Sequence, residues 1–482
     1  MSVRRRLVTG AYWTIGARIL VNLVALFSTF CLAGLLTPDD FGLVAIAATL
    51  LEIISAATNL SLGNALVRQS DLTDDHFHTS WTLSIARSST VGAILAALAW
   101  PAALIYGDDR LIDVMLVFAA SLAITGFANP KLIVFTRDLV FSQDFFLQVS
   151  QKIMAFAVSL TLALIYHSYW ALVFGVLASQ VTYVAVSYVL KPHVPRLGLR
   201  HWRELFTFSY WMTLQDLIYT IGWGLDHLLI GTLMGRTALG HFAVASNLAV
   251  TPLREAGLSI CNLMFPGLAR VVGDRERVKA AYVSAQRLLV AIMLPAGFGI
   301  ALCAEPAVMA FLGKTWFPAV PAIQGLAIIM ALQSFGLLAK PLAMAHGAAR
   351  RLFYHNLAAF LIAMPLSIAG LVVAGLEGLV IGRIVGGLFA IACNLILVRR
   401  LIGLPISNQI HSSWRTPAGV AVMTAGVSSF QHVFEGASGP LILGGTLVVG
   451  GVLYAGTHYT LWRCTGRDDG PERELLNLFG KG

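Results

Sequence analysis

The chain of 482 residues is 57% hydrophobic and only 12% charged, and its mean hydropathy is +0.77. Soluble domains carry about 25% charged residues, so this composition excludes a soluble protein and indicates one that lies in a bilayer. The net charge of +9 would fit a nucleic-acid ligand, but the positions of the basic residues explain it without one.

Apolar runs of about 20 residues recur along the chain, each long enough to cross a hydrocarbon core about 30 Å thick. Alternating strand patterns of about ten residues, which a barrel needs, are absent. We therefore predict an all-α polytopic membrane protein with about fourteen transmembrane helices. Their expected cores are 9–35, 43–66, 81–106, 112–135, 146–166, 169–190, 206–233, 241–265, 283–311, 320–346, 353–374, 377–398, 416–434 and 439–462.

The basic residues are distributed by side of the membrane. With a cytoplasmic N-terminus, most Lys and Arg residues fall in the even-numbered connections and the two tails, whereas the outer connections hold Arg110, Arg236 and Lys314. Because cytoplasmic loops are enriched in Lys and Arg, both termini are expected in the cytoplasm. The first apolar run is too long for a secretion signal and lacks a small-residue cleavage site, so it is expected to remain as helix one.

The stretch "LLTPDDFGLVAIA" places two acidic residues in a tight polar turn between the first two expected helices. We expect Pro38 to end the first helix and the second helix to begin at Gly42. A similar stretch, "IGTLMGRTALGHFAVAS", lies at 230–246, and Gly42 matches Gly240 at an offset of 198 residues, from 42 to 240. The chain is therefore interpreted as a duplication of about six helices, with two copies of the same orientation around a substrate path.

The expected domains follow from this duplication. They are an N-terminal lobe of helices one to six at 1–190, a cytoplasmic linker at 191–205, a C-terminal lobe of helices seven to twelve at 206–400, two additional helices at 401–462 and a cytoplasmic tail at 463–482.

Charges inside the expected helices follow similar registers. Arg18 falls opposite Asp216 at an offset of 198, and Glu52 matches Arg254 at an offset of 202, from 52 to 254. A charge facing lipid costs about 2.5–3.5 kcal/mol, so these side chains are expected to face a protein or water-filled interior. At 100° per residue, polar side chains align in four stripes: Thr14, Arg18, Asn22 and Thr29; Glu52, Ser55 and Asn59; Asp216, Tyr219, Trp223 and Asp226; Asn247, Thr251, Arg254 and Asn262.

These stripes predict a cavity for an amphiphilic anionic glycoconjugate, because amides, carboxylates and aromatic faces suit sugars, and the guanidinium fork matches phosphate oxygens. Glu52, Asp216 and Asp226 are candidates for carrying a coupling proton or sodium ion, or for pairing within a lobe. The predicted cavity residues are Arg18, Asn22, Asn59, Tyr219, Trp223, Asn247, Arg254 and Lys340.

Structural roles stand beside these functional ones. Arg18–Glu52 and Asp216–Arg254 would also fit salt bridges that hold each lobe together. Lys340 precedes Pro341 and would fit either the cavity wall or a proline-broken helix. Tyr219 and Trp223 would fit ordinary packing between helices, and Arg87 and Lys152 are expected to extend toward the membrane interface.

The turn "LLTPDDFGLVAIA", preceded by an arginine-bearing helix and echoed at helices seven and eight, resembles the polysaccharide-type (Wzx and WzxC-like) flippases of the multidrug/oligosaccharidyl-lipid/polysaccharide exporter superfamily. The resemblance covers nearly the whole chain in helix number, duplication and topology. It implies two lobes around a cationic cavity, which translocate undecaprenyl-pyrophosphate-linked oligosaccharide across the bacterial inner membrane by alternating access. The translocated repeat units would be used for exopolysaccharide, capsule or O-antigen. The last two helices would be an appendage to the two lobes, and some relatives have a lipid-tail groove there.

Other function classes share parts of this pattern. A lipid II flippase also handles a polyprenyl pyrophosphate, and a multidrug antiporter would share the fold but typically has an acidic residue, not Arg18, in its first helix. An enzyme is least favoured, because paired-acid loops, nucleotide cradles and nucleophile triads are absent. The five cysteines are scattered singly, so neither a disulfide nor a metal site is expected, and no cofactor is predicted beyond a coupling ion. The expected partners are the lipid-linked oligosaccharide, membrane lipids and polysaccharide polymerase or export proteins.

Overall fold

The computed structural model describes residues 3–58, 66, 73–137, 141–200, 202, 210–434 and 439–465, which are mostly helical and contain no strand. Nine of the described helices are long and apolar enough to cross a membrane. The predicted all-α polytopic class is therefore confirmed. The count of about fourteen spans and the cytoplasmic position of the termini stay predictions.

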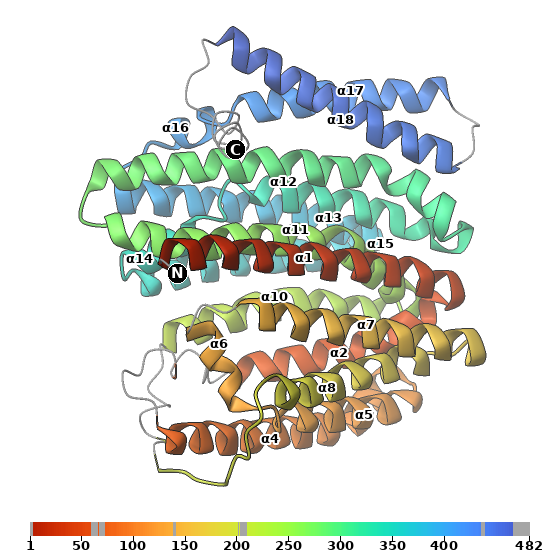
Figure 1. The fold of residues 1–482 in the computed structure, drawn as a ribbon. Coiled ribbons are helices and arrows are strands. Elements are labelled where there is room, and N and C mark those ends of the chain that lie inside the picture. Colours follow the sequence, from red (N-terminus) through yellow and green to blue (C-terminus); the bar gives the residue numbers. More distant parts are fainter. Residues whose placement is uncertain are drawn as a thin grey trace. The chain divides into compact units, whose positions relative to one another are not determined.

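The chain divides into two compact units, and the first runs from Met1 to Ala243. Within it α1 packs on α7, α7 on α8, α4 on α5, α5 on α8, and α10 along α2 (Figure 1). Because α10 packs along α2, it falls in the first unit, whereas the sequence repeat places it in the second lobe. The elements of the first unit are α1 (Val3–Leu35), α2 (Pro38–Ala57), α4 (Asp74–Tyr106), α5 (Arg110–Thr125), η1 (Pro130–Leu132), α6 (Ile133–Arg137), α7 (Phe141–Tyr166), α8 (Trp170–Leu190), α10 (Tyr210–Leu233) and the start of α11 (Arg236–Val271).

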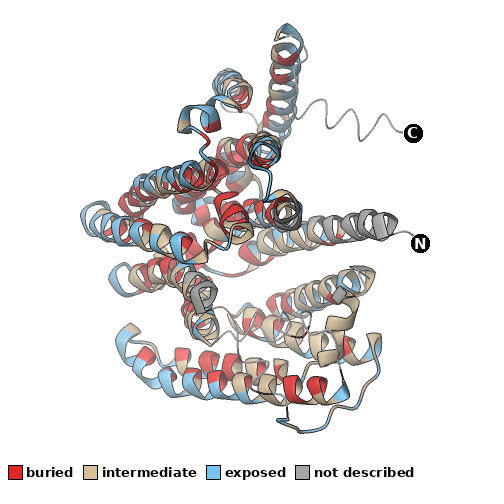
Figure 2. Ribbon diagram, turned by 90° about the vertical axis from the view of Figure 1, so that its left-hand side faces the viewer, coloured by how far each residue is buried: buried red, intermediate tan, exposed pale blue. Residues whose placement is uncertain are grey.

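The second unit runs from Val244 to Gly482. Its core joins α12, α13 and α17 through Val290, Leu294, Ala331, Phe335, Val420, Met423 and Val427. Figure 2 shows that buried positions alternate with intermediate and exposed positions along the helices. Many of the exposed side chains are themselves apolar, among them Trp100, Leu104 and Val373, as expected for helices that contact lipid. After α11 its elements are α12 (Arg275–Phe311), η2 (Lys314–Ala319), α13 (Val320–Gln333), α14 (Ala339–Ala345), α15 (Ala349–Ile402), α16 (Ile406–His411), α17 (Arg415–Val433) and α18 (Gly439–Cys464).

Each predicted membrane segment overlaps a helix, and two boundaries take an unexpected form. The segments 353–374 and 377–398 form the single element α15, which kinks at Ala374 and Gly375, where Gly375 has a φ of 61°. The segment 320–346 is broken into α13 and α14. Gly370 and Gly378 pack so closely that a Cβ on either would overlap the backbone of the other, so the two arms of α15 pack against each other across the kink.

The acidic turn after helix one differs from the prediction. Pro38 does not end the first helix but begins the second, since α1 ends at Leu35 and Thr37 is the N-cap of α2. The Thr37 side chain accepts a hydrogen bond from the Asp40 N–H, and Asp40 accepts one from the Thr37 N–H at 3.0 Å, which makes a capping box. A proline is favoured at the first helical position because its fixed φ suits the helix and no N–H is needed there. Asp39 and Asp40 therefore lie in the first turn of α2.

The two repeat-related glycines make reciprocal contacts in the first unit. A Cβ on Gly42 would overlap the carbonyl oxygen of Arg236, and a Cβ on Gly240 would overlap the carbonyl oxygen of Pro38. The offset of 198 residues relates Gly42 to Gly240 and Pro38 to Arg236. The two contacts therefore lie at equivalent positions of the repeat, one in each direction. Close approach of two backbones requires glycine at both positions.

Candidate functional site

Arg18 and Asn22 lie one turn apart on α1, and both are half-buried. The sequence paired Arg18 with Glu52, but Glu52 is exposed on α2. Asp144, on α7, which packs against α1, is a carboxylate close enough to interact with the Arg18 charge. Asp144 also accepts a hydrogen bond from Gln148 at 2.7 Å. Sequence reasoning missed Asp144, because nothing in the chain's periodicity reveals that helices one and five are neighbours.

Arg87 is a second residue with an unforeseen role. Its guanidinium donates to the carbonyl oxygens of Thr58 at 2.8 Å and Ser55 at 2.9 Å, at the C-terminal end of α2. A cation at a helix C-terminus satisfies carbonyls that have no partner within the helix and interacts favourably with the helix dipole. Arg87 therefore caps α2 from α4, rather than extending toward the interface.

The predicted stripe on α10 separates into two environments. Tyr219 is 49% exposed and Trp223 is half-buried, whereas Asp226 is wholly buried although it lies on the same helix face. Other faces of α10 pack closely on neighbouring helices, since a Cβ on Gly224 would lie 2.6 Å from Ile53 and one on Gly231 would lie 2.9 Å from the ring of Tyr106. Tyr219 is thus open to a ligand, and Asp226 is packed inside the unit.

In the second unit, Asn247 and Arg254 lie two turns apart on α11, and both are exposed. Arg254 Nε lies 4.0 Å from Glu255 Oε1, on the adjacent residue, so the guanidinium keeps an open side. Exposed polar groups at this spacing share one helix face and are available to a charged ligand.

Lys340 lies at the break between α13 and α14 and is half-buried. Carbonyls freed by the break are bonded from neighbouring helices: Gln286 Nε2 donates to Phe335 O at 3.0 Å, and Cys261 Sγ to Leu337 O at 3.7 Å. Lys340 is close enough to Cys261 for its charge to interact with the thiol. Side chains of α11 and α12 therefore help to hold the break, and both predicted roles of Lys340, in the cavity wall or at the broken helix, stay predictions.

Two predicted site residues cannot be placed. Asn59 lies outside the described residues, and the Asp216 backbone is helical while its side chain lies outside what the structure describes. The structure therefore does not test the predicted pair of Asp216 and Arg254, which stays a prediction. Among the described residues, no group of three or more His, Cys, Asp or Glu side chains is arranged to hold a metal ion.

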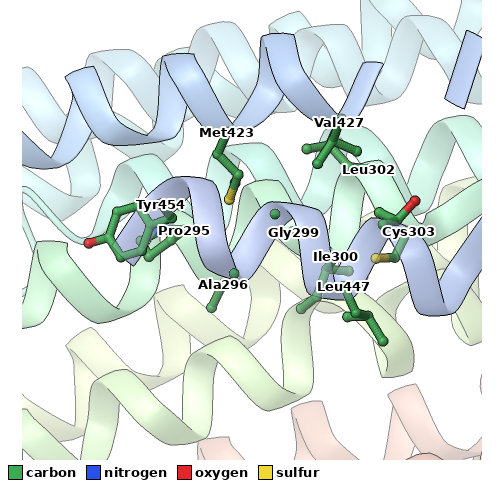
Figure 3. A pocket seen from close by; sticks show the side chains of 13 residues that line it. Pro295, Ala296, Gly299, Ile300, Leu302, Cys303, Met423, Val427, Leu447 and Tyr454 are labelled. Atoms are coloured by element: carbon green, nitrogen blue, oxygen red, sulfur yellow. The ribbon is translucent and has the colours of Figure 1, made fainter. Parts of the chain in front are cut away.

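An apolar groove lies in the second unit between α12, α17 and α18 (Figure 3). Its volume is about 320 Å³, at the lower end of the range of about 300–1,000 Å³ for ligand pockets. Its few polar side chains include Tyr454, which donates to Ala291 O at 2.8 Å, and Thr446, which accepts from Gln431 at 3.1 Å. The lining is Pro295, Ala296, Gly299, Ile300, Leu302, Cys303, Met423, Val427, Thr446, Leu447, Gly450, Gly451 and Tyr454.

The fold defines the class of protein. The solved structure "Lipid II flippase MurJ, inward closed conformation" superposes with a TM-score of 0.75 over 95% of this chain and 99% of that one, at 13% identity. The chain is therefore a polytopic α-helical membrane protein with the fold of that flippase.

The family is shown by sequence. The family "Polysaccharide biosynthesis protein" matches residues 31–321, so the chain belongs to it. Lipopolysaccharide biosynthesis protein WzxC of Escherichia coli (strain K12) is 19% identical over 423 residues, which are 86% of this chain and 85% of that protein. Succinoglycan biosynthesis transport protein ExoT of Rhizobium meliloti (strain 1021) is 22% identical over 299 residues, 62% of this chain and 60% of that protein.

Proposed function

We propose that the protein is a flippase that moves a polyprenyl-pyrophosphate-linked oligosaccharide across the bacterial inner membrane by alternating access. Membership of the polysaccharide biosynthesis family over residues 31–321 carries this proposal, and the similarity to a succinoglycan transport protein supports movement rather than synthesis. The identity of the sugar repeat is left open by this reasoning.

The headgroup is bound by the open polar faces in this proposal. Arg18 on α1 and Arg254 on α11 bind the pyrophosphate, because a guanidinium offers paired donors that match phosphate oxygens. Tyr219 and Trp223 stack on sugar rings, and Asn22 and Asn247 replace water around the hydroxyls. Their exposure or half-burial supports these roles. Asn59 and Lys340 complete the proposed cavity set.

The lipid is bound by the groove between α12, α17 and α18 in this proposal. A polyprenyl chain is a flexible hydrocarbon, so an apolar groove can bind it through van der Waals contacts, without needing polar partners. Met423, Leu447 and Ile300 supply apolar contacts, and Gly299 and Gly451 leave room for the chain, since a Cβ on either would meet nothing within 4 Å. The last two helices thereby form the lipid site of the transporter.

Rocking of the lobes 1–190 and 206–400 about the linker 191–205 would expose the headgroup site to each side in turn, with the helices at 401–462 accompanying the second lobe and the tail 463–482 remaining cytoplasmic. The exposed carboxylate of Glu52 would carry a coupling proton or sodium ion, which is worth about 2.3 kcal/mol per charge per 100 mV. Asp216 and Asp226 are the further candidates. A polysaccharide polymerase or export protein would take the flipped product.

The test is a flipping assay in proteoliposomes with a fluorescent polyprenyl-pyrophosphate oligosaccharide. Wild type is expected to flip the probe, and Arg18→Ala and Arg254→Ala to lose flipping while keeping normal melting temperatures. Arg277→Ala is the matched control, because Arg277 is exposed and paired with Asp274 in the connection before α12. Selective flipping of lipid II would support the lipid II alternative, which is compatible with the fold shared with the lipid II flippase MurJ. Export of cationic dyes without any lipid flipping would contradict the proposal.

A further inference from the structure

Four charged side chains meet at the predicted outer end of the first unit: Asp39 of α2, Asp108 of the connection between α4 and α5, Arg110 of α5 and Arg236 of α11. Arg110 lies 3.2 Å from Asp39 and 2.9 Å from Asp108. Arg236 lies 3.2 Å from Asp39 and also contacts Asp108. Each arginine therefore bridges the same two carboxylates, and the four charges sum to zero. We call these four residues the outer charge cluster.

The two arginines differ in what they connect. Arg110, Asp108 and Asp39 all precede position 190 and belong to the first predicted half of the duplication, whereas Arg236 begins α11 in the second half. Arg110 also lies over the ring of Tyr169, with 5.6 Å to the centroid, and is thereby held within the first half. Arg236 therefore forms ion pairs between the two halves, and Arg110 positions the two carboxylates with which Arg236 pairs.

Close backbone contacts between α2 and α11 connect the same two halves next to the outer charge cluster. Gly42 lies against the carbonyl of Arg236, and Gly240 against the carbonyl of Pro38. Both contacts lie at the starts of α2 and α11, next to the ion pairs of Arg236. One pseudo-twofold contact of small residues and one ion-pair bridge thus hold the same two helix ends together.

We propose that the outer charge cluster and the Gly42–Gly240 contact form a latch, which holds the outer ends of the two halves together while the transporter faces the cytoplasm and opens when it faces outward. This inference rests on the proposed alternating-access function and adds the residues that govern one of its two states. Two observations favour a separable contact over a permanent one. Arg236 and Asp39 are partly exposed, with side-chain exposures of 27% and 35%, so water can reach the ion pair between them. Glycine backbones also lack side chains that would interlock.

The latch is tested by hydrogen–deuterium exchange on the full-length protein in lipid nanodiscs, comparing Arg236→Gln with Arg110→Gln. Arg236→Gln removes the bridge between the halves, so we expect exchange in peptides covering 36–42 and 234–241 to become roughly two- to tenfold faster, since each partly exposed ion pair contributes a factor of this order. Arg110→Gln leaves Arg236 between its two carboxylates and should have a smaller effect on 234–241. Raising the salt concentration should reproduce the Arg236→Gln effect in wild type.

Gly240→Ala provides a second variant that keeps every charge. Its added Cβ would overlap the carbonyl of Pro38, so it should also speed exchange at both helix starts. Unchanged exchange at 36–42 and 234–241 in folded Arg236→Gln and Gly240→Ala would overturn the latch. Equal effects of Arg236→Gln and Arg110→Gln on 234–241 would also overturn it, because the charges would then act only as a local structural network. Exchange does not depend on a substrate, so a failure of wild type to flip lipid would refute the proposed function and leave this test intact.

Discussion

Arg18 on α1 lies close enough to Asp144 on α7 for their opposite charges to attract each other within the first unit. A charge-reversal experiment on Arg18 should therefore include Asp144 as a partner, as well as the exposed Glu52. A buried or half-buried charge is commonly paired, and a paired arginine can still present its remaining donors to a ligand.

The first prediction concerns that pair. We expect Arg18→Ala to reduce flipping about tenfold or more, because it removes a phosphate-binding fork. Asp144→Asn should reduce flipping less, since it leaves the fork in place. The double reversal Arg18→Asp/Asp144→Arg should keep the melting temperature of wild type but stay inactive in the proteoliposome assay. Normal flipping by the reversed pair would make Arg18 a structural residue and would move the phosphate site elsewhere.

The second prediction concerns the groove. Gly451→Leu should fill it without a clash, because a Cβ there meets nothing within 4 Å. We expect slower flipping of long-chain substrate by about fivefold, the factor that corresponds to losing roughly 1 kcal/mol of van der Waals contacts at about 0.1–0.2 kcal/mol each, and little change for a short-chain analogue. Gly444→Leu, also unobstructed and on the same helix but outside the groove lining, is the control. Equal rates for both variants and both chain lengths would place the lipid outside the groove.

The third prediction concerns the cap on α2. Arg87→Met keeps the length of the side chain but removes its hydrogen bonds to Thr58 and Ser55, so it should lower the free energy of unfolding by about 1.5–3 kcal/mol. Thr90→Val is the control, since Thr90 is exposed and bonds to Ala86 of its own helix. Thermal unfolding in detergent measures both. Similar melting temperatures for Arg87→Met and wild type would mean that solvent or lipid satisfies those carbonyls equally well.

The linker between the predicted lobes contacts the start of α4 through defined bonds. The rings of His78 and His193 stack with centroids 5.6 Å apart, the Arg196 N–H donates to His78 Nδ1 at 3.1 Å, and Arg200 pairs with Asp75 at 2.9 Å. The segment 191–200 is therefore held along the first turns of α4.

The fourth prediction is that this contact weakens in acid. Burial and the nearby charge of Lys131 lower the pKa of His193 from its usual 6.5, while Asp74 opposes the shift and His78 adds to it. A histidine with a lowered pKa binds its proton more tightly when the linker is released, so the contact is stable above about pH 6.5 and is lost as pH falls below that value. Exchange in peptides covering 191–200, corrected for intrinsic rate, should rise on acidification.

His193→Gln is the control for that measurement. Glutamine cannot titrate in this range, so the linker exchange of this variant should change less between neutral and mildly acidic pH than that of wild type. A linker whose corrected exchange stays constant in wild type as well would show that His193 does not control the contact.

Several features of this protein could be predicted from local sequence. The membrane segments were recognisable because a bilayer requires about 20 consecutive apolar residues, and each predicted segment overlaps a helix. The repeat at offset 198 placed Gly42 and Gly240 in equivalent positions before any contact between them was known. Pro38 was taken to end the first helix, but it begins the second, because proline suits both places.

The candidate site was predictable only in part. Tyr219 and Asp226 share a face by periodicity, yet Tyr219 is 49% exposed and Asp226 is wholly buried, because burial depends on where the neighbouring helices lie. The roles of Arg87 and Asp144, and the convergence of four charges at Arg236, depend on which helices are neighbours. The sequence by itself determined the membrane helices and their repeat, since these follow from interactions along one helix and with the bilayer. Only the tertiary structure decided which charge meets which, because a side chain's partners come from other helices whose packing no local pattern specifies.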